Sequence, residues 1–542
     1  MALVLSKNDN YITSSSKHEG EYVNAGAFGI IRRIKTPVLK DQKEEEEHNT
    51  NIHGNGKELQ HVVRKRIKGS DIYSIYGGLT YSSVRECTTL RNFAHHPHII
   101  QHQGIFVHPN GTIDILLPEY EMDLMEWIMQ THNFQTRVDK IPYLLRCLSS
   151  ALVTMHQTGY LHRDIKLHNI LFNPSTDEVC LIDFGSSRCM SLSHRDSMAV
   201  DEDKNTPPEE YCVFPLTTEQ TTFPYRAPET YNSHYNAKSD IYSLGCTMIY
   251  VIVRSFPYKD EWIEYTKKYG NGSNERNARA TMFSHYPTSH DWLIYLNRYK
   301  DFLDSLVFNT LKRMIHPNPR KRPSAQEIFQ LFSHDPIPTC VPTSIRPTNP
   351  TGVLEGLARN AFLRFIEPYA KTFFTPHSVY VGIRLFQRIY PQWERTYADI
   401  HMRPKNKEEE HTISTKKSRK NRREQNIQAK YDDFSRKLFD MSTIWYLMFV
   451  CCSIAEHFIS TDMRVRTAYI IDVMQEDTEM MNQQKMTEEL FTHVESKVFI
   501  LADCCVWWGK LDVEPFTQHL IHSNVFIEQM WKKVVYVLMF KV

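Results

Sequence analysis

The sequence has no excess of charge of one sign, no long apolar segment and no C-x-x-C cysteine pair. Its 64 Lys and Arg residues balance 63 Asp and Glu residues, which leaves a net charge of +1. Nucleic acids and membrane surfaces attract basic proteins, so we expect neither as the main partner. The longest apolar run, 444–455, is shorter than the roughly 18 residues of a membrane-spanning helix and predicts a buried helix.

Cysteine spacing and the N-terminal sequence argue against further classes of protein, namely zinc-binding, dithiol redox and secreted proteins. Without a C-x-x-C spacing among its 11 cysteines, the chain lacks the usual signature of a zinc site or a redox dithiol. Reduced thiols favour an intracellular protein, either cytoplasmic or nuclear. The apolar run 2–5 is too short for the core of a secretion signal, so we expect no export. The chain also has no internal repeat.

What is present is typical of a globular protein of several domains. Hydrophobic residues make up 41% and charged residues 23% of 542 residues. Strand-like patterns dominate up to Asp123, and helix-like patterns dominate after it, with Asn110-Gly111 as a hairpin turn. In order, the pattern predicts strands over 21–35 and 59–68, a helix over 82–93, strands over 99–108 and 112–118, and short apolar segments at 170–172 and 179–182.

A proline-rich stretch, 336–353, is the best domain boundary, because its prolines can neither continue a helix nor sit in a central strand. We therefore expect an N-terminal extension over 1–19, a first domain over 20–335 and a helical domain over 354–542. The helical part contains a basic insertion at 402–430. The basic cluster 416–423 within it fits either a nuclear localisation signal or a charged loop tip.

Three motifs carry the chemistry. Residues 162–169 read H-R-D-I-K-L-H-N, residues 183–185 read D-F-G, and residues 227–229 read A-P-E. Together they resemble the catalytic loop, the metal-binding triplet and the activation-segment anchor of eukaryotic-type protein kinases, over about 20–335. The resemblance implies an α+β two-lobed kinase fold, with a β-rich N-lobe and a helical C-lobe. The helix-like pattern of 354–542 predicts that an all-α C-terminal domain follows it.

The resemblance assigns roles to four residues of these motifs. Asp164 would accept the proton of the substrate hydroxyl, and Lys166 would contact the phosphoryl group in transfer. Asn169 and Asp183 would bind Mg²⁺ through oxygen atoms. The implied cofactors are ATP and Mg²⁺, and the implied partners are protein substrates. Each residue alone would be an ordinary loop residue, whereas all four at this spacing specify the family.

Upstream residues resemble the nucleotide-binding half of the same family. Residues 24–31 read N-A-G-A-F-G-I-I and match the glycine-rich loop, except that Asn24 replaces the first glycine. Lys65 matches the strand lysine that holds the α- and β-phosphates, because Val63 and Lys65 share one face of the strand. Its partner would be Glu86. The nucleotide-binding set that the resemblance implies is Gly26, Gly29, Ile31, Lys65, Glu86, Leu117, Glu119, Tyr120 and Leu171.

Some family positions fix geometry instead of reacting. Glu229 and Arg322 match a buried ion pair that anchors the activation segment, and Asp240 matches the helix aspartate that holds the catalytic-loop backbone. The hinge that would meet adenine lies near 117–120. Either Leu117 or Pro118 takes the gatekeeper position.

The segment T-x-x-Y-R-A-P-E at 222–229 resembles that of cyclin-dependent kinases, and with Lys166 it implies serine or threonine as acceptor. In those kinases, arginines at three matching positions converge on a phosphothreonine, which here would be Thr217. Thr218, Thr221 or a serine of the long activation segment are alternatives. The three arginines are Arg85, Arg163 and Arg188.

Numb-associated kinases are the competing subfamily, since they share the long activation segment. The C-terminal region helps to discriminate, because 359–369, 375–390, 445–459 and 486–508 resemble helices of a cyclin box. Glu495 would supply the glutamate of the fifth cyclin helix, whereas the lysine that pairs with it is not apparent. The alternative is a generic helical accessory domain.

These observations predict an ATP-dependent serine/threonine kinase that transfers the γ-phosphoryl group to protein hydroxyls. A cyclin-like domain in the same chain would regulate it by docking on the helix that carries Glu86. Two other hypotheses are a pseudokinase scaffold and a kinase-like adaptor whose C-terminal region serves targeting.

Overall fold

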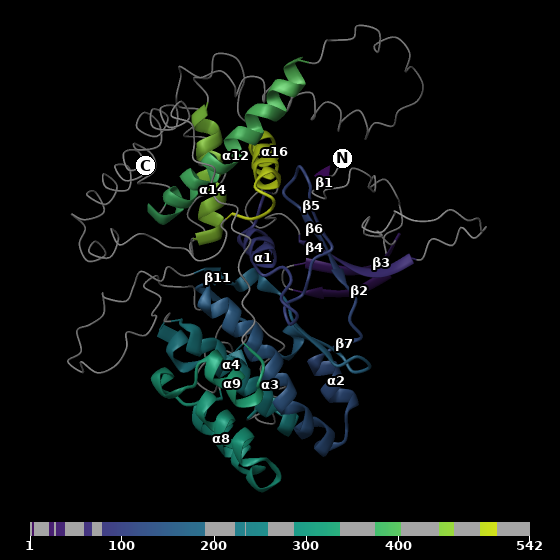
Figure 1. Ribbon diagram of the computed structural model, residues 1–542, viewed down its shortest axis with the longest axis vertical. Helices are drawn as coiled ribbons and strands as arrows, with labels where there is room; N and C mark the ends of the chain where they lie inside the picture. Colours follow the sequence, from purple (N-terminus) through teal and green to yellow (C-terminus); the bar gives the residue numbers. More distant parts are fainter. Residues whose placement is uncertain are drawn as a thin grey trace, which may run out of the picture.

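The computed structural model describes two lobes and a group of C-terminal helices (Figure 1). The residues it describes are 3–4, 21–26, 29–37, 59–67, 78–189, 223–232, 235–257, 287–336, 374, 376–402, 444–459 and 488–506. The expected proline-rich linker, apart from its first residue, lies outside them. So do the first expected cyclin-box helix, the basic cluster and Thr217.

The first lobe is a six-stranded antiparallel sheet with the strand order β1-β5-β6-β4-β3-β2. Gly111 closes the turn between β5 and β6 with a φ of +78°, a left-handed conformation that glycine adopts without strain. The strands are β1 (Leu3–Val4), β2 (Glu21–Gly26), β3 (Gly29–Pro37), β4 (Leu59–Ile67), β5 (Gly104–Val107) and β6 (Ile113–Pro118).

Two details of the sheet differ from the sequence prediction. Leu3 and Val4, assigned to an extension, pair with β5 and add an edge strand to the lobe. The strand predicted from residue 99 begins only at Gly104, because the preceding segment turns toward the second lobe. There Ile99 forms an isolated bridge with Leu181, whose backbone also bonds to that of Ile100.

Helix α1 (Tyr81–Asn92) packs between the sheet and the C-terminal helices (Figure 1). The Thr80 side chain accepts from the backbone N–H of Ser83, and the Ser83 side chain accepts from that of Thr80, which forms a capping box. This reciprocal cap starts the helix one residue before the predicted position. Most of α1 is buried, including its polar residues Arg85 and Glu86.

The second lobe is mainly helical, as its sequence pattern predicts. Its core surrounds α3 and α4, with the fully buried Trp292 and Tyr242 among the largest side chains. Strands β7 (Met122–Asp123), β9 (Ile170–Asn173) and β10 (Glu178–Leu181) form one small sheet, and β8 (Tyr160–Leu161) and β11 (Arg188–Cys189) form another. The helices are α2 (Leu124–Gln130), α3 (Phe134–Gln157), α4 (Ala237–Val253), α7 (Ser289–Asn297), α8 (Ser305–Met314) and α9 (Ala325–Phe332).

Three C-terminal helices lie beside α1, on the side away from the second lobe (Figure 1). They are α12 (Pro376–Met402), α14 (Ile444–Ile459) and α16 (Glu488–Leu501), and they fall where the sequence predicts helices. Gly382 allows α12 and α14 to approach closely, since a Cβ there would lie 2.7 Å from Cα of Cys452. The apolar run 444–455 therefore forms a buried helix of a bundle.

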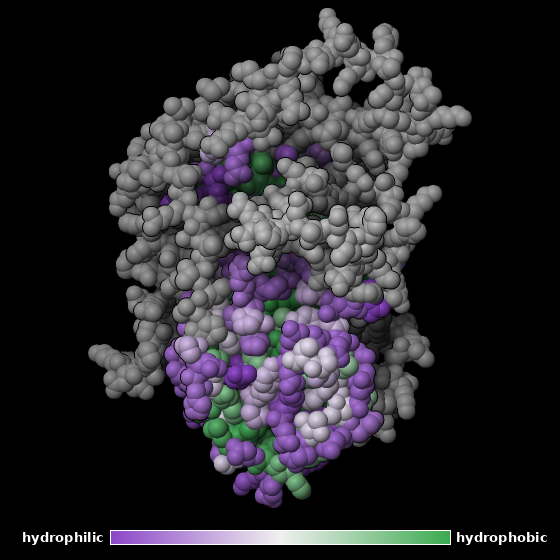
Figure 2. Space-filling view, turned by 45° about the vertical axis from the view of Figure 1, so that its right-hand side comes forward, coloured by the Kyte–Doolittle hydropathy of each residue, from purple (hydrophilic) through white to green (hydrophobic). Residues whose placement is uncertain are grey.

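The described surface of the second lobe is largely hydrophilic, with hydrophobic residues gathered near its lower edge (Figure 2). Among the described helices, none is long and apolar enough to cross a membrane. None of the nine described cysteines forms a disulfide bond, and eight of them are buried.

Candidate active site

Lys65 and Glu86 form a buried ion pair between the sheet and α1. Nζ of Lys65 lies 2.6 Å from Oε1 and 2.9 Å from Oε2 of Glu86. Lys65 belongs to β4 and Glu86 to α1, 21 residues apart in sequence. The pair therefore joins α1 to the sheet, in the register that the sequence predicts for the strand lysine.

Asp183 shares the same lysine. Its Oδ1 lies 2.9 Å from Nζ of Lys65, so two carboxylates meet one ammonium group. Burial alone would lower the pKa of Lys65, but Asp183 and Glu86 outweigh it and raise that pKa above its usual value. Burial raises the pKa of Glu86, with Lys65 opposing, whereas Lys65 outweighs burial at Asp183 and lowers its pKa.

The backbone around Asp183 is held in an unusual conformation. Asp183 has a φ of +66°, which costs free energy for a residue with a side chain. Phe184 is fully buried against the His162 ring, with ring centroids 5.2 Å apart. A Cβ on Gly185 would lie 3.1 Å from Cβ of Ser82 at the start of α1. The glycine thus lets this segment pass directly beside α1.

The residues of the predicted catalytic loop converge on Asp164. Nζ of Lys166 lies 2.6 Å from Oδ2 of Asp164. Nδ2 of Asn169 donates to the backbone oxygen of Asp164 at 2.8 Å and to its Oδ2 at 3.1 Å. The backbone of Asn169 also accepts from Ile182, the residue before Asp183, at 3.0 Å. The structure therefore brings the four predicted catalytic and metal-binding residues into one region.

Asp240 of α4 holds the catalytic loop from below. It accepts hydrogen bonds from the backbone N–H of His162 at 3.0 Å and of Arg163 at 2.9 Å. Nε2 of His156 is 2.9 Å from the same carboxylate. Burial would raise the pKa of Asp240, but the contact with His156 outweighs it and lowers that pKa. Sequence reasoning missed His156, because a histidine near the end of a helix carries no signal of its own.

The strand register places the nucleotide-binding candidates on one face. Ile31 is opposite Lys65, and Leu117 is opposite Val63. Because opposed residues of antiparallel strands point to the same side, these four residues share a face. Pro118, the next residue, points to the other side. The register therefore favours Leu117 over Pro118 as the gatekeeper candidate.

The structure also describes the glycine-rich hairpin and the hinge, which lie at the two ends of the predicted nucleotide-binding region. Gly26 and Gly29 pair at the end of the β2–β3 hairpin, and the two residues between them lie outside the described part. At the hinge, Oε1 of Glu119 lies 2.5 Å from Nε of Arg33 on β3, a contact that the sequence did not predict. Tyr120 and Leu171 are partly buried against the core.

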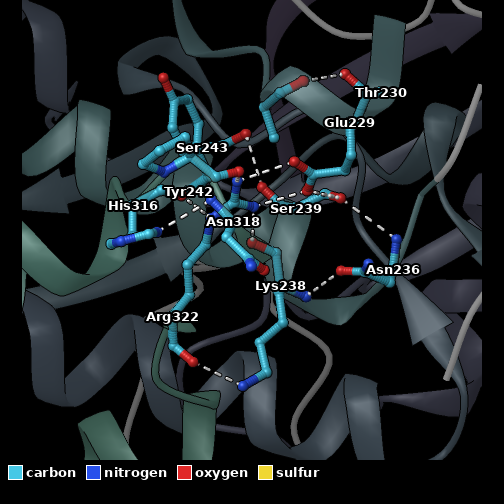
Figure 3. A network of polar contacts seen from close by, with 12 residues as sticks. Glu229, Thr230, Asn236, Lys238, Ser239, Tyr242, Ser243, His316, Asn318 and Arg322 are labelled. Carbon is cyan, nitrogen blue, oxygen red and sulfur yellow. Dashed lines mark hydrogen bonds and ion pairs between the residues drawn. The ribbon is translucent and has the colours of Figure 1, made fainter. Parts of the chain in front are cut away.

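Glu229 and Arg322 form the expected anchor (Figure 3). Arg322 donates from both terminal nitrogens to the carboxylate, at 2.7 and 2.9 Å. Ser239 of α4 donates to the same carboxylate at 2.8 Å, and the Arg322 backbone oxygen accepts from Lys238 at 2.8 Å. The network ties the segment after 226 to α4.

The three predicted regulatory arginines have partners other than a phosphate in the described residues. Arg85 and Arg188 both donate to the backbone oxygen of Phe458, at 3.4 and 3.2 Å. Arg163 donates to the Ser186 backbone oxygen at 3.4 Å and lies over the ring of Tyr235. Thr217, Thr218 and Thr221 lie outside the described residues, so their relation to these arginines stays a prediction.

Among the described residues, no group of three His, Cys, Asp or Glu side chains could hold a metal ion by itself. Asn169 and Asp183 nevertheless offer the oxygen donors that Mg²⁺ prefers. Since Nδ2 of Asn169 donates to Asp164, its amide oxygen is the atom that a metal ion would use. Such a pair fits an ion that completes its shell with phosphate and water oxygens.

Comparisons with known proteins point to the same family as the motifs. A model described as the protein kinase domain matches residues 54–332. Cyclin-dependent kinase B2-1 of Arabidopsis thaliana is 24% identical over 289 residues, which cover 50% of this chain and 85% of that protein. Serine/threonine-protein kinase ppk23 of Schizosaccharomyces pombe is 27% identical over 285 residues, covering 47% of this chain and 61% of that protein.

A chain in the solved CAK complex of Chaetomium thermophilum bound to ATP-gamma-S aligns with a TM-score of 0.40 and 22% identity, covering 59% of this chain and 92% of that one. The kinase-domain match itself spans more than half of the 542 residues. It includes the strand lysine, the catalytic loop, the D-F-G triplet and the anchor described above. The chain belongs to the protein kinase family and is a serine/threonine protein kinase with an α+β two-lobed kinase fold.

Proposed function

We propose that this kinase uses Mg²⁺-ATP to phosphorylate serine or threonine residues of proteins, and that its own C-terminal helices hold α1 in the position that transfer requires. The observation that carries the proposal is the arrangement around α1. Glu86 faces Lys65 on the side of the sheet, while other residues of the same region bond to the segment 488–506.

The chemistry is assigned to the catalytic loop. Asp164 accepts the proton of the substrate hydroxyl while the hydroxyl oxygen bonds to the γ-phosphorus and the bond to the β–γ bridging oxygen breaks. Lys166 lies 2.6 Å from Asp164, so its charge is in position to stabilise the phosphoryl group in transfer. Asn169 orients Asp164 through its amide nitrogen.

ATP binding is assigned to the face of the sheet that carries Lys65. Lys65 holds the α- and β-phosphates, with Ile31 and Leu117 beside it on the same face. Asn169 and Asp183 would hold a Mg²⁺ ion, which would neutralise phosphate charge. In the described state Lys65 contacts both Glu86 and Asp183, which is the arrangement that positions the lysine for phosphate.

The segment 488–506, which is α16 and the residues that follow it, bonds to both ends of the α1 region. Just before its N-terminus, the backbone N–H of Leu79 donates to Oε2 of Glu495 on α16 at 3.2 Å. Near its C-terminus, Arg91 forms an ion pair with Asp503. The backbone N–H of Val506 donates to Oγ1 of Thr88 at 3.2 Å.

Glu495 is buried, with only 1% of its surface accessible to solvent. Burial raises its pKa, while His457 and the Leu79 N–H oppose that shift. Oε1 of Glu495 lies 3.8 Å from Nδ1 of His457, and Ser453 donates to Oε1 at 3.3 Å. A histidine and a serine of α14 therefore surround the glutamate where the cyclin resemblance would place a lysine.

Because α1 is one rigid helix, these contacts bear on Glu86. Without them, α1 would populate positions in which Glu86 no longer reaches Lys65, which is a shift of population and not damage to the site. Covalent linkage keeps the local concentration of the helices at about the millimolar level, so even a weak interface stays occupied.

The experiment uses the full chain with a protease recognition sequence inserted within 342–350. Before cleavage, the chain should phosphorylate a generic serine/threonine substrate at the wild-type rate. After cleavage and dilution into the nanomolar range, kcat should fall about tenfold or more, because the helices are then lost to mass action. A chain with a scrambled recognition sequence controls for the protease. Unchanged kcat after cleavage, with the pieces separated on a sizing column, would favour the hypothesis of a targeting domain.

A second variant examines the contact itself. Glu495→Ala should lower kcat several-fold, because it removes the acceptor of Leu79 N–H and leaves a cavity between α14 and α1. Glu126→Ala, at an exposed position of α2, is the matched control and should have no effect. Absence of any phosphoryl transfer by the wild-type chain would support the pseudokinase hypothesis.

A further inference from the structure

Two arginines of the kinase lobes meet at the C-terminal end of α14. Arg85 of α1 donates from Nε to the Phe458 backbone oxygen at 3.4 Å. Arg188 of β11 donates from Nη1 to the same oxygen at 3.2 Å and also to the backbone oxygen of Ile459. Phe458 and Ile459 are the last two residues of α14. The arginines thus converge on the terminal carbonyls of one helix.

A helix end is a suitable partner for this pair of guanidinium groups. The last four carbonyls of an α-helix lack acceptor partners within the helix and together carry about half a negative charge. Arg85 and Arg188 have only 5% and 3% of their surfaces exposed, so water does not compensate their charges. Burial, with the neighbouring Arg163, lowers the pKa of Arg85 to about 9. The helix end therefore supplies negative potential to two buried cations.

The same contact joins the parts of the site that must be aligned. Arg85 directly precedes Glu86 on α1. Arg188 pairs with Leu161 in the β11–β8 ladder, and Leu161 precedes the catalytic loop at His162. One helix end is therefore bonded to the helix that positions Lys65 and to β11, the strand that follows the D-F-G segment. Strand β11 in turn pairs with β8, the strand that precedes the H-R-D segment.

We propose that the C-terminal end of α14 takes the role of an activating phosphate for Arg85 and Arg188, so that the docked chain is active without phosphorylation of its activation segment. The proposal rests on the proposed function, since it presumes docking of the C-terminal helices in the active chain. It differs from the prediction made from the sequence, in which these arginines bind the phosphate of a phosphorylated Thr217. A phosphate that reached this place would have to share both guanidinium groups with the helix end.

The test is a cycle of two perturbations on the full-length chain. Wild type and Arg188→Ala are each assayed before and after treatment with a protein phosphatase, with the phosphate content measured by intact mass. If the helix end is the partner, treatment changes the kcat of wild type by less than about threefold, and Arg188→Ala loses about tenfold or more in both states. If a phosphothreonine is the partner, treatment lowers the wild-type kcat about tenfold or more, and the variant no longer responds to treatment.

Two controls keep the outcome interpretable. Arg313→Ala removes an arginine that is 52% exposed and lies 3.8 Å from Glu327; it should leave kcat unchanged in both states. Arg188→Lys keeps one donor for a carbonyl and should recover part of the kcat. If circular dichroism shows that Arg188→Ala does not fold, the wild-type chain alone tests the proposal. A loss of kcat of about tenfold or more after phosphatase treatment overturns the proposal, and a loss of less than about threefold supports it.

Failure of the inference and failure of the proposed function give different results. A chain that is active but depends on phosphorylation overturns only the inference. A chain that transfers no phosphoryl group in either state, or whose kcat is unaffected by cleavage of the linker, overturns the proposed function.

Discussion

Arg322 and Glu229 lie 93 residues apart and face each other in a two-pronged ion pair in which the arginine side chain is completely buried. The guanidinium group also donates to the backbone oxygens of His316, Pro317 and Lys238. Its charge is thus compensated by one carboxylate and three carbonyls, which is the condition under which a buried ion pair is tolerated.

Removal of one partner should therefore be costly. Arg322→Met should lower the free energy of unfolding by about 3–5 kcal/mol, because Glu229 keeps a charge without its main partner. The matched control is Arg146→Met, which breaks an exposed pair with Asp335 and should cost at most about 1 kcal/mol. Urea unfolding gives both numbers. Equal losses for the two variants would contradict the assigned role of the buried pair.

Asp164 should be essential for turnover and dispensable for folding. Asp164→Asn keeps the shape but cannot accept the substrate proton, so kcat should fall by a factor of about 100 to 10,000. Asp139→Asn, at an exposed position of α3, is the control and should retain wild-type kcat. Steady-state kinetics at saturating ATP measure the effect, and the melting temperatures of both variants should stay near that of wild type. Wild-type kcat for Asp164→Asn would remove this residue from the site.

Substitution of Lys65 and of its neighbour Arg66 on β4 should have different effects, the first on activity and the second on stability. Lys65→Met should abolish most activity, because Lys65 lies on the face that we assign to ATP and contacts Glu86 and Asp183. Arg66→Met should keep activity and lose stability, because Arg66 points to the other face and forms two 2.7 Å bonds with Asp114. Nucleotide affinity by fluorescence and unfolding in urea distinguish the two effects. The reverse pattern would mean that the strand register is wrong.

Asp114 should make stability dependent on pH in the acid range. Burial opposes its charge, but hydrogen bonds from Arg66 and His108 outweigh burial and lower its pKa from 3.8 to about 2. A depressed pKa in the folded state contributes stability that is complete above about pH 4 and lost as the pH falls toward 2. At pH 3, roughly 1 kcal/mol of the contribution of Asp114 to the free energy of unfolding should be lost.

The comparison is between wild type and Asp114→Asn, which lacks this titration. The difference in their free energies of unfolding should be constant from pH 7 to about pH 5 and should shrink by pH 3. Asp139→Asn, which replaces an exposed carboxylate of α3, is measured in parallel as the control. A difference that is unchanged at pH 3 would show that the Asp114 contacts do not favour its charged form.

The sequence predicted the lobes and the site better than the connections between the parts. Motif spacing and strand periodicity are local, so Asp164, Asp183 and the register of Lys65 could be located before the structure. Hairpin geometry likewise predicted the turn at Gly111. The strand expected from residue 99 was too long, because periodicity does not show that Ile99 turns to bridge Leu181.

Contacts between distant segments could not be predicted in the same way. The pairing of Leu3 and Val4 with β5 depends on a free sheet edge, which only the fold reveals. Donation by Arg188 to carbonyls of α14 uses backbone atoms, and backbone atoms leave no signature in the amino-acid sequence. The family resemblance names a side chain, phosphorylated Thr217, as a partner of the same arginine, and this stays a prediction because Thr217 lies outside the described residues. The identity of a backbone acceptor is therefore a result that required the structure.

The helices that contact α1 belong to the same chain as the catalytic loop. Every molecule that is synthesised therefore carries one copy of each, and their ratio stays fixed at any level of expression. Dilution, dosage or turnover of a separate activator cannot change the fraction of kinase lobes that have these helices available. Control by abundance would act on the whole protein. Under the proposed function, control of the kinase through these helices would act on how tightly α14 and α16 contact α1.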